Sequence, residues 1–422
     1  MAIDNKDKKV LKSSIEREQN EVACSAECEK IKGSKNLNVP HLRFTEFSGE
    51  WKEELLDRIA TLSKGIGIPK EQLSEDGDPC ILYGELYTKY KSEIIKQVES
   101  KTDIDGSKLK RSKANDVIIP CSGETAVDIA TARCVPFDSI LLGGDLNVIS
   151  LHKYDGAFMS YQLNGKRKYD IARVAQGVSV VHLYGEHLKT IKTYNPTLPE
   201  QQKIAILLSL LDERIATQNK IIEDLKKLKC AIIEKLYSKI QGKEYSYGQL
   251  FDVVNERNKQ MEYSNILSAS QEKGMVNRDD LNLDIQFERS NINTYKIVRK
   301  GDYVIHLRSF QGGFAFSDKL GVCSPAYTIL RPNSLLEYSY LSYYFTSRRF
   351  IKSLIIVTYG IRDGRSINVE EWLNMKVVIP SKEHQLHTLN VLKRIDDKVE
   401  NEEKYATCLS NQKQYLLRQM FI

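Results

Sequence analysis

The sequence predicts an α+β fold in which two mixed α/β blocks form a tandem pseudo-twofold repeat, separated by two long antiparallel coiled-coil helices. Short apolar runs cut by Gly, Pro and Asn, such as "DVIIPCSG" and "GVSVVHLY", indicate strand-rich blocks with a minority of helix. The segment "EQQKIAILLSLLDERIATQNKIIEDLKKLKCAIIEKLY" contains no Gly or Pro and indicates one long amphipathic helix. Block and helix then occur a second time in the same order, which is typical of an internal duplication.

Composition limits the class of protein. A chain of 422 residues predicts two or three domains, and 41% hydrophobic with 28% charged residues is typical of soluble globular proteins. No apolar run approaches the roughly 18 residues of a membrane span, and the N-terminus lacks the apolar core of a signal peptide, so we expect a cytoplasmic location. Eight scattered Cys suit a reducing compartment. Cys24 and Cys28 are close together but have no further ligand nearby, so we expect no metal site.

Five parts follow along the chain. The arm mixes acidic and basic residues around few apolar ones, which indicates a flexible or frayed-helical segment. A net charge of +6 weakly favours an anionic partner. The expected parts are an N-terminal arm at 1–45, a first block at 46–198, a central long helix at 199–242, a second block at 243–380 and a C-terminal long helix at 381–422.

The two helical segments align with an offset of 396 − 212 = 184, which places Asp212 on Asp396. In both, apolar residues recur at spacings of three and four, the heptad pattern of a coiled coil. The expected interface includes Leu211, Ile215, Gln218, Ile222, Leu225, Lys229 and Ile232 in the first helix, and Ile395, Val399, Glu402, Leu409, Lys413 and Leu416 in the second.

Polar residues interrupt both ladders at equivalent positions. If the helices pair antiparallel, we expect Lys229 to face Glu402 and Gln218 to face Lys413, so that these contacts fix the register. A homodimeric coiled coil, or a core helix of a larger domain, is the alternative. Further apolar residues outside the ladder indicate either packing on the blocks or docking of a partner: Leu207, Leu210, Ile221 and Leu228.

Several stretches carry a family resemblance. They are "NVPHLRFTEFSGEW", "GIGIPKEQLSEDGDPCILYGELYTKY", "DVIIPCSGETAVDIA", "LPEQQKIAILLSLLDERI" and "KEHQLHTLNVLKRIDDKVENE". Together with the order of blocks and helices, they resemble the specificity subunit of type I restriction–modification enzymes over residues 38–422. Residues 1–37 of the N-terminal arm lie outside the resemblance.

The resemblance implies a non-catalytic subunit whose two blocks are target recognition domains. Each domain would recognise one half of a bipartite target in double-stranded DNA, and the helices would set the gap. It also implies two adenine-N6 methyltransferase subunits and ATP-driven restriction (translocase) subunits as partners. S-adenosylmethionine and ATP with Mg²⁺ are then expected on those partners, and no cofactor is expected in this chain.

The residues themselves favour a binding protein over an enzyme. The chain has no G-x-x-x-x-G-K-[ST] phosphate loop, and its seven His show neither metal nor triad spacing. "YNPTLP" has Asn195 and Pro196 but lacks the aromatic continuation of an amino-methyltransferase site, so we interpret it as an extended lead into the helix. We therefore expect no catalytic residue. A coiled-coil scaffold without a nucleic-acid role is the alternative function.

DNA contacts in the first block are expected from a basic stretch and from hydroxyl side chains. Cations bind phosphates and position the protein, and a solvated loop or stacked core tyrosines are the alternatives for this stretch. Ser122 and Thr125, in "SGET", are candidates near bases or phosphates, with turn capping as the alternative. The basic candidates are Lys89, Lys91, Lys101, Lys108, Lys110, Arg111 and Lys113.

In the second block, "IHLRSFQGGFAF" places Arg308, Ser309 and Gln311 beside two glycines. Arg and Gln form paired hydrogen bonds with base edges, so this is the expected site of base recognition. Further candidates are Arg348, Arg349, Arg362 and Arg365. For Arg348 and Arg349 the alternative is the polar face of a helix that covers the sheet. The target sequence depends on loop geometry and DNA shape, which residue types do not fix.

Overall fold

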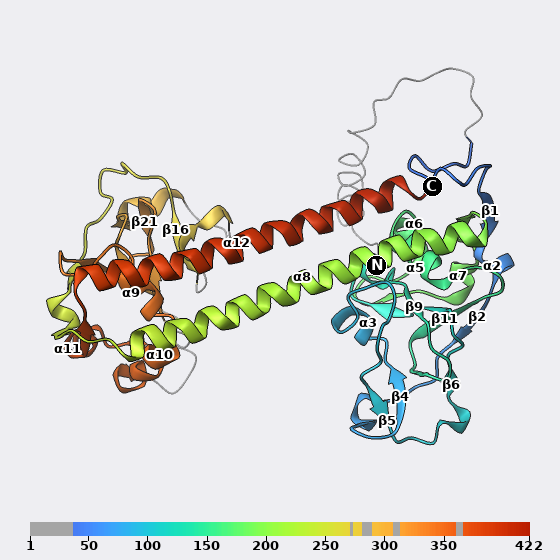
Figure 1. Ribbon diagram of the computed structural model, residues 1–422, viewed down its shortest axis with the longest axis horizontal. Coiled ribbons are helices and arrows are strands. Elements are labelled where there is room, and N and C mark those ends of the chain that lie inside the picture. The colour runs from blue at the N-terminus through green and yellow to red at the C-terminus, as the bar shows by residue number, and fades with distance from the viewer. Residues whose placement is uncertain (1–36, 271–272, 281–288, 307–312, 360–365) are drawn as a thin grey trace, which may run out of the picture. The chain divides into compact units, whose positions relative to one another are not determined.

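The computed structural model describes residues 37–270, 273–280, 289–306, 313–359 and 366–422 (Figure 1). The chain divides into two compact units: residues up to Asp212 together with Gln412–Ile422 form unit 1, and Glu213–Asn411 form unit 2. Each unit therefore contains its own block and a part of each long helix. These helices are α8 (Leu198–Ser238) and α12 (Lys382–Gln419).

The centre of unit 1 is an antiparallel four-stranded sheet in the order β2-β11-β7-β9. Strand β7 is buried along its whole length, which is why "VIIP" in its sequence is a continuous apolar run rather than an alternating pattern. A second sheet has the order β3-β5-β4-β10-β6, in which β10 and β4 run parallel. The strands are β2 (Ala60–Lys64), β3 (Leu73–Ser74), β4 (Asp78–Ile81), β5 (Lys101–Thr102), β6 (Lys110–Arg111), β7 (Asp116–Pro120), β9 (Arg133–Val135), β10 (Leu141–Leu142) and β11 (Leu146–Leu151).

Short helices cover this sheet. Helix α5 packs on β7 and β9 and is capped at its N-terminus by Asp155, whose carboxylate accepts a hydrogen bond from the Phe158 amide at 2.7 Å. Two small sheets complete unit 1, β1 with β13 and β8 with β12. The remaining elements are β1 (Lys52–Leu55), α2 (Leu56–Ile59), α3 (Glu85–Thr88), β8 (Ser122–Gly123), α4 (Ala126–Ile129), α5 (Gly156–Asn164), α6 (Lys168–Val174), β12 (Val181–His182), α7 (Gly185–Lys189) and β13 (Lys192–Asn195).

The segment before β1 is tied to the ends of both long helices. Arg43 forms two charge-assisted hydrogen bonds with the buried Glu200 carboxylate, at 2.7 and 2.8 Å, in the first turn of α8. Trp51, Phe158 and Phe421 pack with ring centroids 5.2 to 6.3 Å apart. The motif "HLRFTEFSGEW" thus anchors the start of α8 and the end of α12 to unit 1.

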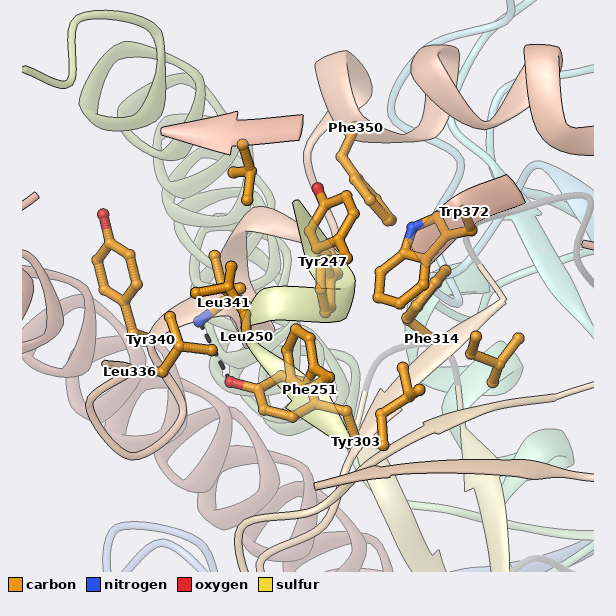
Figure 2. Packing of buried hydrophobic residues seen from close by; sticks show 14 of the residues in the cluster. Tyr247, Leu250, Phe251, Tyr303, Phe314, Leu336, Tyr340, Leu341, Phe350 and Trp372 are labelled. Carbon is orange, nitrogen blue, oxygen red and sulfur yellow. Dashed lines mark hydrogen bonds between the residues drawn. The ribbon is translucent and has the colours of Figure 1, made fainter. Parts of the chain in front are cut away.

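Unit 2 is built around the antiparallel sheet β15-β22-β19-β20. Its strands and helices are β14 (Lys243–Ser246), β15 (Phe251–Val254), β16 (Leu267–Ser270), β17 (Gly274–Asn277), β18 (Lys296–Val298), β19 (Tyr303–Ile305), β20 (Phe314–Phe316), β21 (Gly321–Cys323), β22 (Thr328–Pro332), α9 (Tyr340–Tyr344), α10 (Arg348–Ser353), β23 (Thr358–Tyr359), β24 (Ser366–Ile367), α11 (Val369–Asn374) and β25 (Lys376–Ile379). Aromatic rings fill its core (Figure 2). Tyr247 stacks on Trp372 at 4.2 Å, and the Tyr303 hydroxyl accepts a hydrogen bond from the Leu341 amide at 3.2 Å.

Equivalent parts of the two units differ in residue number by the predicted offset. Strands β13 and β25 begin at Lys192 and Lys376, an offset of 376 − 192 = 184, and each leads into a long helix. Each strand pairs antiparallel with the first strand of its block, β1 or β14. The α+β architecture with two units and two long helices confirms the predicted fold class, and the matching order supports the duplication.

A buried glutamine fixes the start of each long helix in the same way. The Gln201 side chain donates to the Pro196 carbonyl at 2.8 Å and accepts from the Asp155 amide at 2.9 Å. Gln385 donates to the Pro380 carbonyl at 3.1 Å and accepts from the Glu337 amide at 2.8 Å. Both glutamines are 1% exposed, so these bonds satisfy backbone groups that water does not reach.

Candidate nucleic-acid interface

The predicted ladder faces inward on both long helices. Every predicted interface residue from Leu211 to Ile232 and from Ile395 to Leu416 is buried or half-buried. Of the apolar residues outside the ladder, Leu207 is half-buried, whereas the other three are exposed: Leu210, Ile221 and Leu228. The heptad pattern therefore identifies the covered face of each helix.

In unit 1 a lysine of α12 sits between two buried carboxylates. Lys413 Nζ lies 2.6 Å from Asp212 and 2.6 Å from Glu93, and the three side chains are only 12%, 7% and 10% exposed. The Tyr161 hydroxyl donates to Asp212 at 2.7 Å, and the Lys413 ammonium lies 5.6 Å from the Tyr161 ring. Burial raises the pKa of Glu93, and the ion pair with Lys413 opposes this rise.

Unit 2 repeats this arrangement with one carboxylate fewer. Lys229 pairs with Asp396, the Tyr343 hydroxyl donates to Asp396 at 2.6 Å, and the lysine lies 5.3 Å from the Tyr343 ring. Here the lysine and aspartate side chains are 28% and 36% exposed. Burial and the Asp396 hydrogen bond raise the pKa of the Tyr343 phenol. We call each of these Lys–Asp–Tyr arrangements a triad; the tyrosines come from α5 and α9, so each triad joins a block to both helices.

The expected register is wrong. Lys229 contacts Asp396 rather than Glu402, and Lys413 contacts Asp212 and Glu93 rather than Gln218. The amide of Gln218 instead donates to the Glu402 carboxylate, which also pairs with Lys398. Each lysine contacts an acid six residues before the expected partner (402 − 396 = 218 − 212 = 6). A heptad ladder specifies which face of a helix makes contact. The register here depends instead on the tyrosines of the blocks, which hydrogen-bond Asp212 and Asp396, and on Glu93, which pairs with Lys413.

The basic candidates of the first block lie in the described part of the chain, exposed apart from the half-buried Lys110. Lys101, Lys110 and Arg111 share the sheet of β5 and β6. Carboxylates neutralise two of the seven: Lys89 lies 2.7 Å from Glu85 and Arg111 lies 2.6 Å from Asp78. Lys91, Lys108 and Lys113 lie in loops or a short 3₁₀ turn outside this sheet's strands.

Ser122 and Thr125 lie close together at β8 and the start of α4. Thr125 caps α4, because its hydroxyl accepts from the Asp128 amide at 3.1 Å, as the turn-capping alternative expects. Ser122 is half-buried and pairs in the backbone ladder with His182 of β12. The Tyr87 hydroxyl donates to the Ser122 carbonyl at 3.2 Å.

In the second block the expected base-recognition residues Arg308, Ser309 and Gln311 lie outside the described residues, as do Arg362 and Arg365. Arg348 and Arg349 are exposed in the first turn of α10, whose Phe350 is fully buried in the aromatic core. This placement matches the alternative of a polar helix face. Arg349 also lines a cavity of about 260 Å³ together with Lys376, Glu244 and Tyr344.

Unit 1 has an exposed turn before β12 that the sequence did not predict. "GVSVVHLY" is not a long strand: only Val181–His182 form β12, and the residues before it make a tight turn. Gln176 and His182 exchange backbone hydrogen bonds of 2.9 and 2.7 Å, and Val178 at the tip is 86% exposed. The Gly preceding two alternating valines was the available signal for this turn.

Among the residues that the structure describes, no group of three or more His, Cys, Asp or Glu is arranged to hold a metal ion. In the same part of the chain, no helix combines the length and apolar character needed to cross a membrane.

Comparison with known proteins shows a similarity to one family. Residues 48–227 match the family model of the type I restriction modification DNA specificity domain. The curated specificity subunit of the type I restriction enzyme MjaVIII, from Methanocaldococcus jannaschii, is 25% identical in an alignment 324 residues long that covers 69% of this chain and 74% of that protein. The chain is similar to type I restriction–modification specificity subunits.

Solved structures share the fold of this chain. The S subunit of the type I system from M. genitalium aligns over 91% of this chain and 99% of its own, with a TM-score of 0.53 at 16% identity. A chain from a study of complex assembly and conformational transition in a type I system covers 88% of this chain and 97% of its own, with a TM-score of 0.57 at 14% identity. The family match and the curated relative support a role as a non-catalytic DNA specificity subunit.

Proposed function

We propose that the two blocks are two target recognition domains, at residues 46–198 and 243–380, each recognising one half of a bipartite double-stranded DNA target. The observation that carries this proposal is the repeated construction of the units: each has the glutamine at its helix start and the Lys–Asp–Tyr triad at its helix pair. Two blocks mounted in the same way on two helices suit a target with two halves. The arm at 1–45 has no part in this proposal.

In both domains, basic and polar side chains are the proposed DNA contacts. Cations on the sheet of β5 and β6 suit phosphate contacts, since they lie on one sheet and are exposed or half-buried. Arg308, Ser309 and Gln311 have the side chains for base edges in the second domain. Arg348 and Arg349 provide exposed charge there, whereas Phe350 of the same helix holds the core.

The long helices act as spacers in this proposal, at residues 199–242 and 381–422. Helices α8 and α12 contain 41 and 38 residues, or about 60 Å each at 1.5 Å per residue. The buried charge network of unit 1 favours one register of α8 against α12, because a slipped register would leave Asp212 and Lys413 buried without partners. A spacer with a fixed register gives a fixed gap between the half-sites.

The exposed apolar residues of the helices suit docking of two adenine-N6 methyltransferase subunits, which would carry S-adenosylmethionine. Ile221 and Tyr405 occupy equivalent positions (405 − 221 = 184) and are 41% and 39% exposed in unit 2. On unit 1, Ile206 and Leu210 are 60% and 58% exposed. Restriction subunits would bring ATP and Mg²⁺, and the whole complex would work in the cytoplasm. We expect the lone chain to be poorly soluble, because these side chains then stay in water.

The spacer proposal is tested by lengthening both helices. Seven residues are inserted after Asp212 in α8 and after Asn411 in α12, which keeps the heptad phase and leaves both triads intact. Each helix grows by ~10 Å, so the gap between the half-sites should lengthen by about three base pairs while the half-site sequences stay the same. The measurement is a map of methylated adenines after co-expression with the methyltransferase subunit.

Insertion into α8 alone is the control, since helices of unequal length cannot keep both triads and methylation should be lost. An unchanged gap in the doubly lengthened protein would exclude the helices as the spacer.

A further inference from the structure

The turn before β12 is a rigid projection with an apolar tip. Backbone hydrogen bonds between Gln176 and His182 close it. Gly177 adopts φ +123°, where the Cβ of any other residue would lie only 2.1 Å from the Val180 carbonyl oxygen. Buried Val181 and Leu183 anchor it in the core of unit 1. The tip is therefore held in place while Val178 and Val180 are 86% and 53% exposed.

Exposed apolar side chains on a rigid turn cost solubility unless something covers them. Val178 has the highest exposed fraction of the large hydrophobic residues in the described part of the chain. A long strand edge would invite β-pairing, but here Gln176 and His182, at the base of the turn, already pair with each other through their backbone groups. The turn is too short to add a strand, so its exposed side chains are what it presents to a partner.

A row of polar aromatic side chains runs beside the tip. His182 stacks near Tyr184 at 6.2 Å and 25°, and Tyr184 meets His187 edge-on at 5.6 Å. The Lys64 ammonium lies 5.7 Å from the centre of the Tyr184 ring, and Tyr184 is 44% exposed. The Gln176 amide lies 3.5 Å from the His187 ring nitrogen. The nearby acid Glu186 is paired with Lys189 at 2.8 Å.

This combination fits DNA better than a protein surface. An ammonium beside a ring binds phosphate, exposed amide and imidazole groups hydrogen-bond base edges, and small apolar side chains contact thymine methyl groups or enter base steps. An apolar protein partner would not need the cation and the three polar rings. Ser122, paired with His182 in the ladder, places the "SGET" segment next to the same surface.

We propose that the Gln176–His182 turn, with Tyr184 and Lys64, contacts the DNA half-site recognised by unit 1, with Val178 reaching the base pairs. This inference rests on the proposed function, and it names a specificity-determining contact within it. Lys64 and Tyr184 hold the phosphate backbone beside the turn. Val178 discriminates between base pairs at one or two positions of that half-site.

The test uses the assembled complex with the methyltransferase subunit and a duplex carrying its mapped target. Val178→Ser should weaken binding to this duplex by about tenfold and relax methylation specificity in one half-site only. The salt dependence of binding should not change. Lys64→Met should instead weaken binding to all sequences alike and lower the salt slope by about one.

Val253→Ser is the matched control, because Val253 is a 51% exposed valine of β15 in unit 2. It should bind and methylate like the unaltered protein. If Val178→Ser behaves like this control, the turn does not contact DNA and the inference fails while the proposed function stands. If Val178→Ser prevents assembly of the complex, the turn is a protein-docking surface and the inference also fails. If the unaltered complex binds no split target, both the proposed function and this inference fail.

Discussion

The two triads have the same chemistry but different burial, so the same substitution should have unequal effects. Replacing Lys413 by Met keeps most of the length of the side chain but leaves Asp212 and Glu93 without their cation. These acids are 7% and 10% exposed, and breaking a buried pair by removing one partner costs about 3–5 kcal/mol. Lys229→Met removes a pair that is 28% and 36% exposed, for which solvent screening reduces the cost to about 1 kcal/mol or less.

Glu93 makes the larger effect depend on pH. Burial already raises the pKa of Glu93, and losing Lys413 removes the chief influence that lowers it. Glu93 in the Lys413→Met variant should therefore bind a proton as the pH falls, which removes one uncompensated charge. The penalty for Lys413→Met should be smaller at pH 5 than at pH 7.5, whereas the penalty for Lys229→Met should be nearly the same at both.

Hydrogen exchange measured by mass spectrometry on the full chain is the suitable assay, because two units need not unfold in one transition. Peptides from the last turns of α12 report the Lys413 site, and peptides from the C-terminal half of α8 report the Lys229 site. The double variant Glu93→Gln/Lys413→Met should lose less protection than Lys413→Met alone. Equal losses for Lys413→Met and Lys229→Met would refute the reasoning from burial.

Three further predictions follow from the fold. In the unaltered protein the pKa of Glu93 is raised, so unit 1 should lose stability as the pH rises from about 4.5 through that pKa, because the folded state holds the proton more tightly. Glu93→Gln should flatten this pH dependence of stability in urea unfolding, and an unchanged pH dependence would contradict the prediction. Gln201→Ala should destabilise the start of α8 by about 2 kcal/mol, since the Pro196 carbonyl and the Asp155 amide lose their hydrogen-bond partner. Gln202→Ala, at the exposed neighbouring position, should leave stability unchanged in the same measurement. Arg362 follows Val178 by the repeat offset of 184 and lies outside the described residues. Arg362→Met should relax methylation specificity only in the half-site that Val178→Ser leaves intact. A change in both half-sites would argue against two separate recognition domains.

Periodicity and repetition made the architecture predictable. The ladder of α8 depends on spacings of three and four without Gly or Pro, and burial follows the same positions. The offset of 184 transfers from the helices to β13 and β25 because both strands lead directly into them. These signals are local in sequence, which is why the sequence alone carries them.

Side-chain contacts between distant segments were not predictable in the same way. Glu93 reaches Lys413 across 320 positions in sequence, and no local pattern marks that pair. Gln218 was expected opposite Lys413, but the block tyrosines and Glu93 determine where the lysine binds. The turn around Val178 resembled a strand, because alternating valines and a following His–Leu–Tyr fit a strand pattern until Gly177 breaks it.

The most direct test of the central claim is co-expression with the partner methyltransferase subunit, followed by genome-wide mapping of methylated adenines. Two recognition domains on a spacer predict a split motif with a fixed gap and one methylated adenine in each half. Replacing either block, 46–198 or 243–380, should then change one half of the motif and leave the other half and the gap as they were. An assembled complex that methylates an undivided motif, or whose two halves both change when one block is replaced, would contradict the two-domain mechanism.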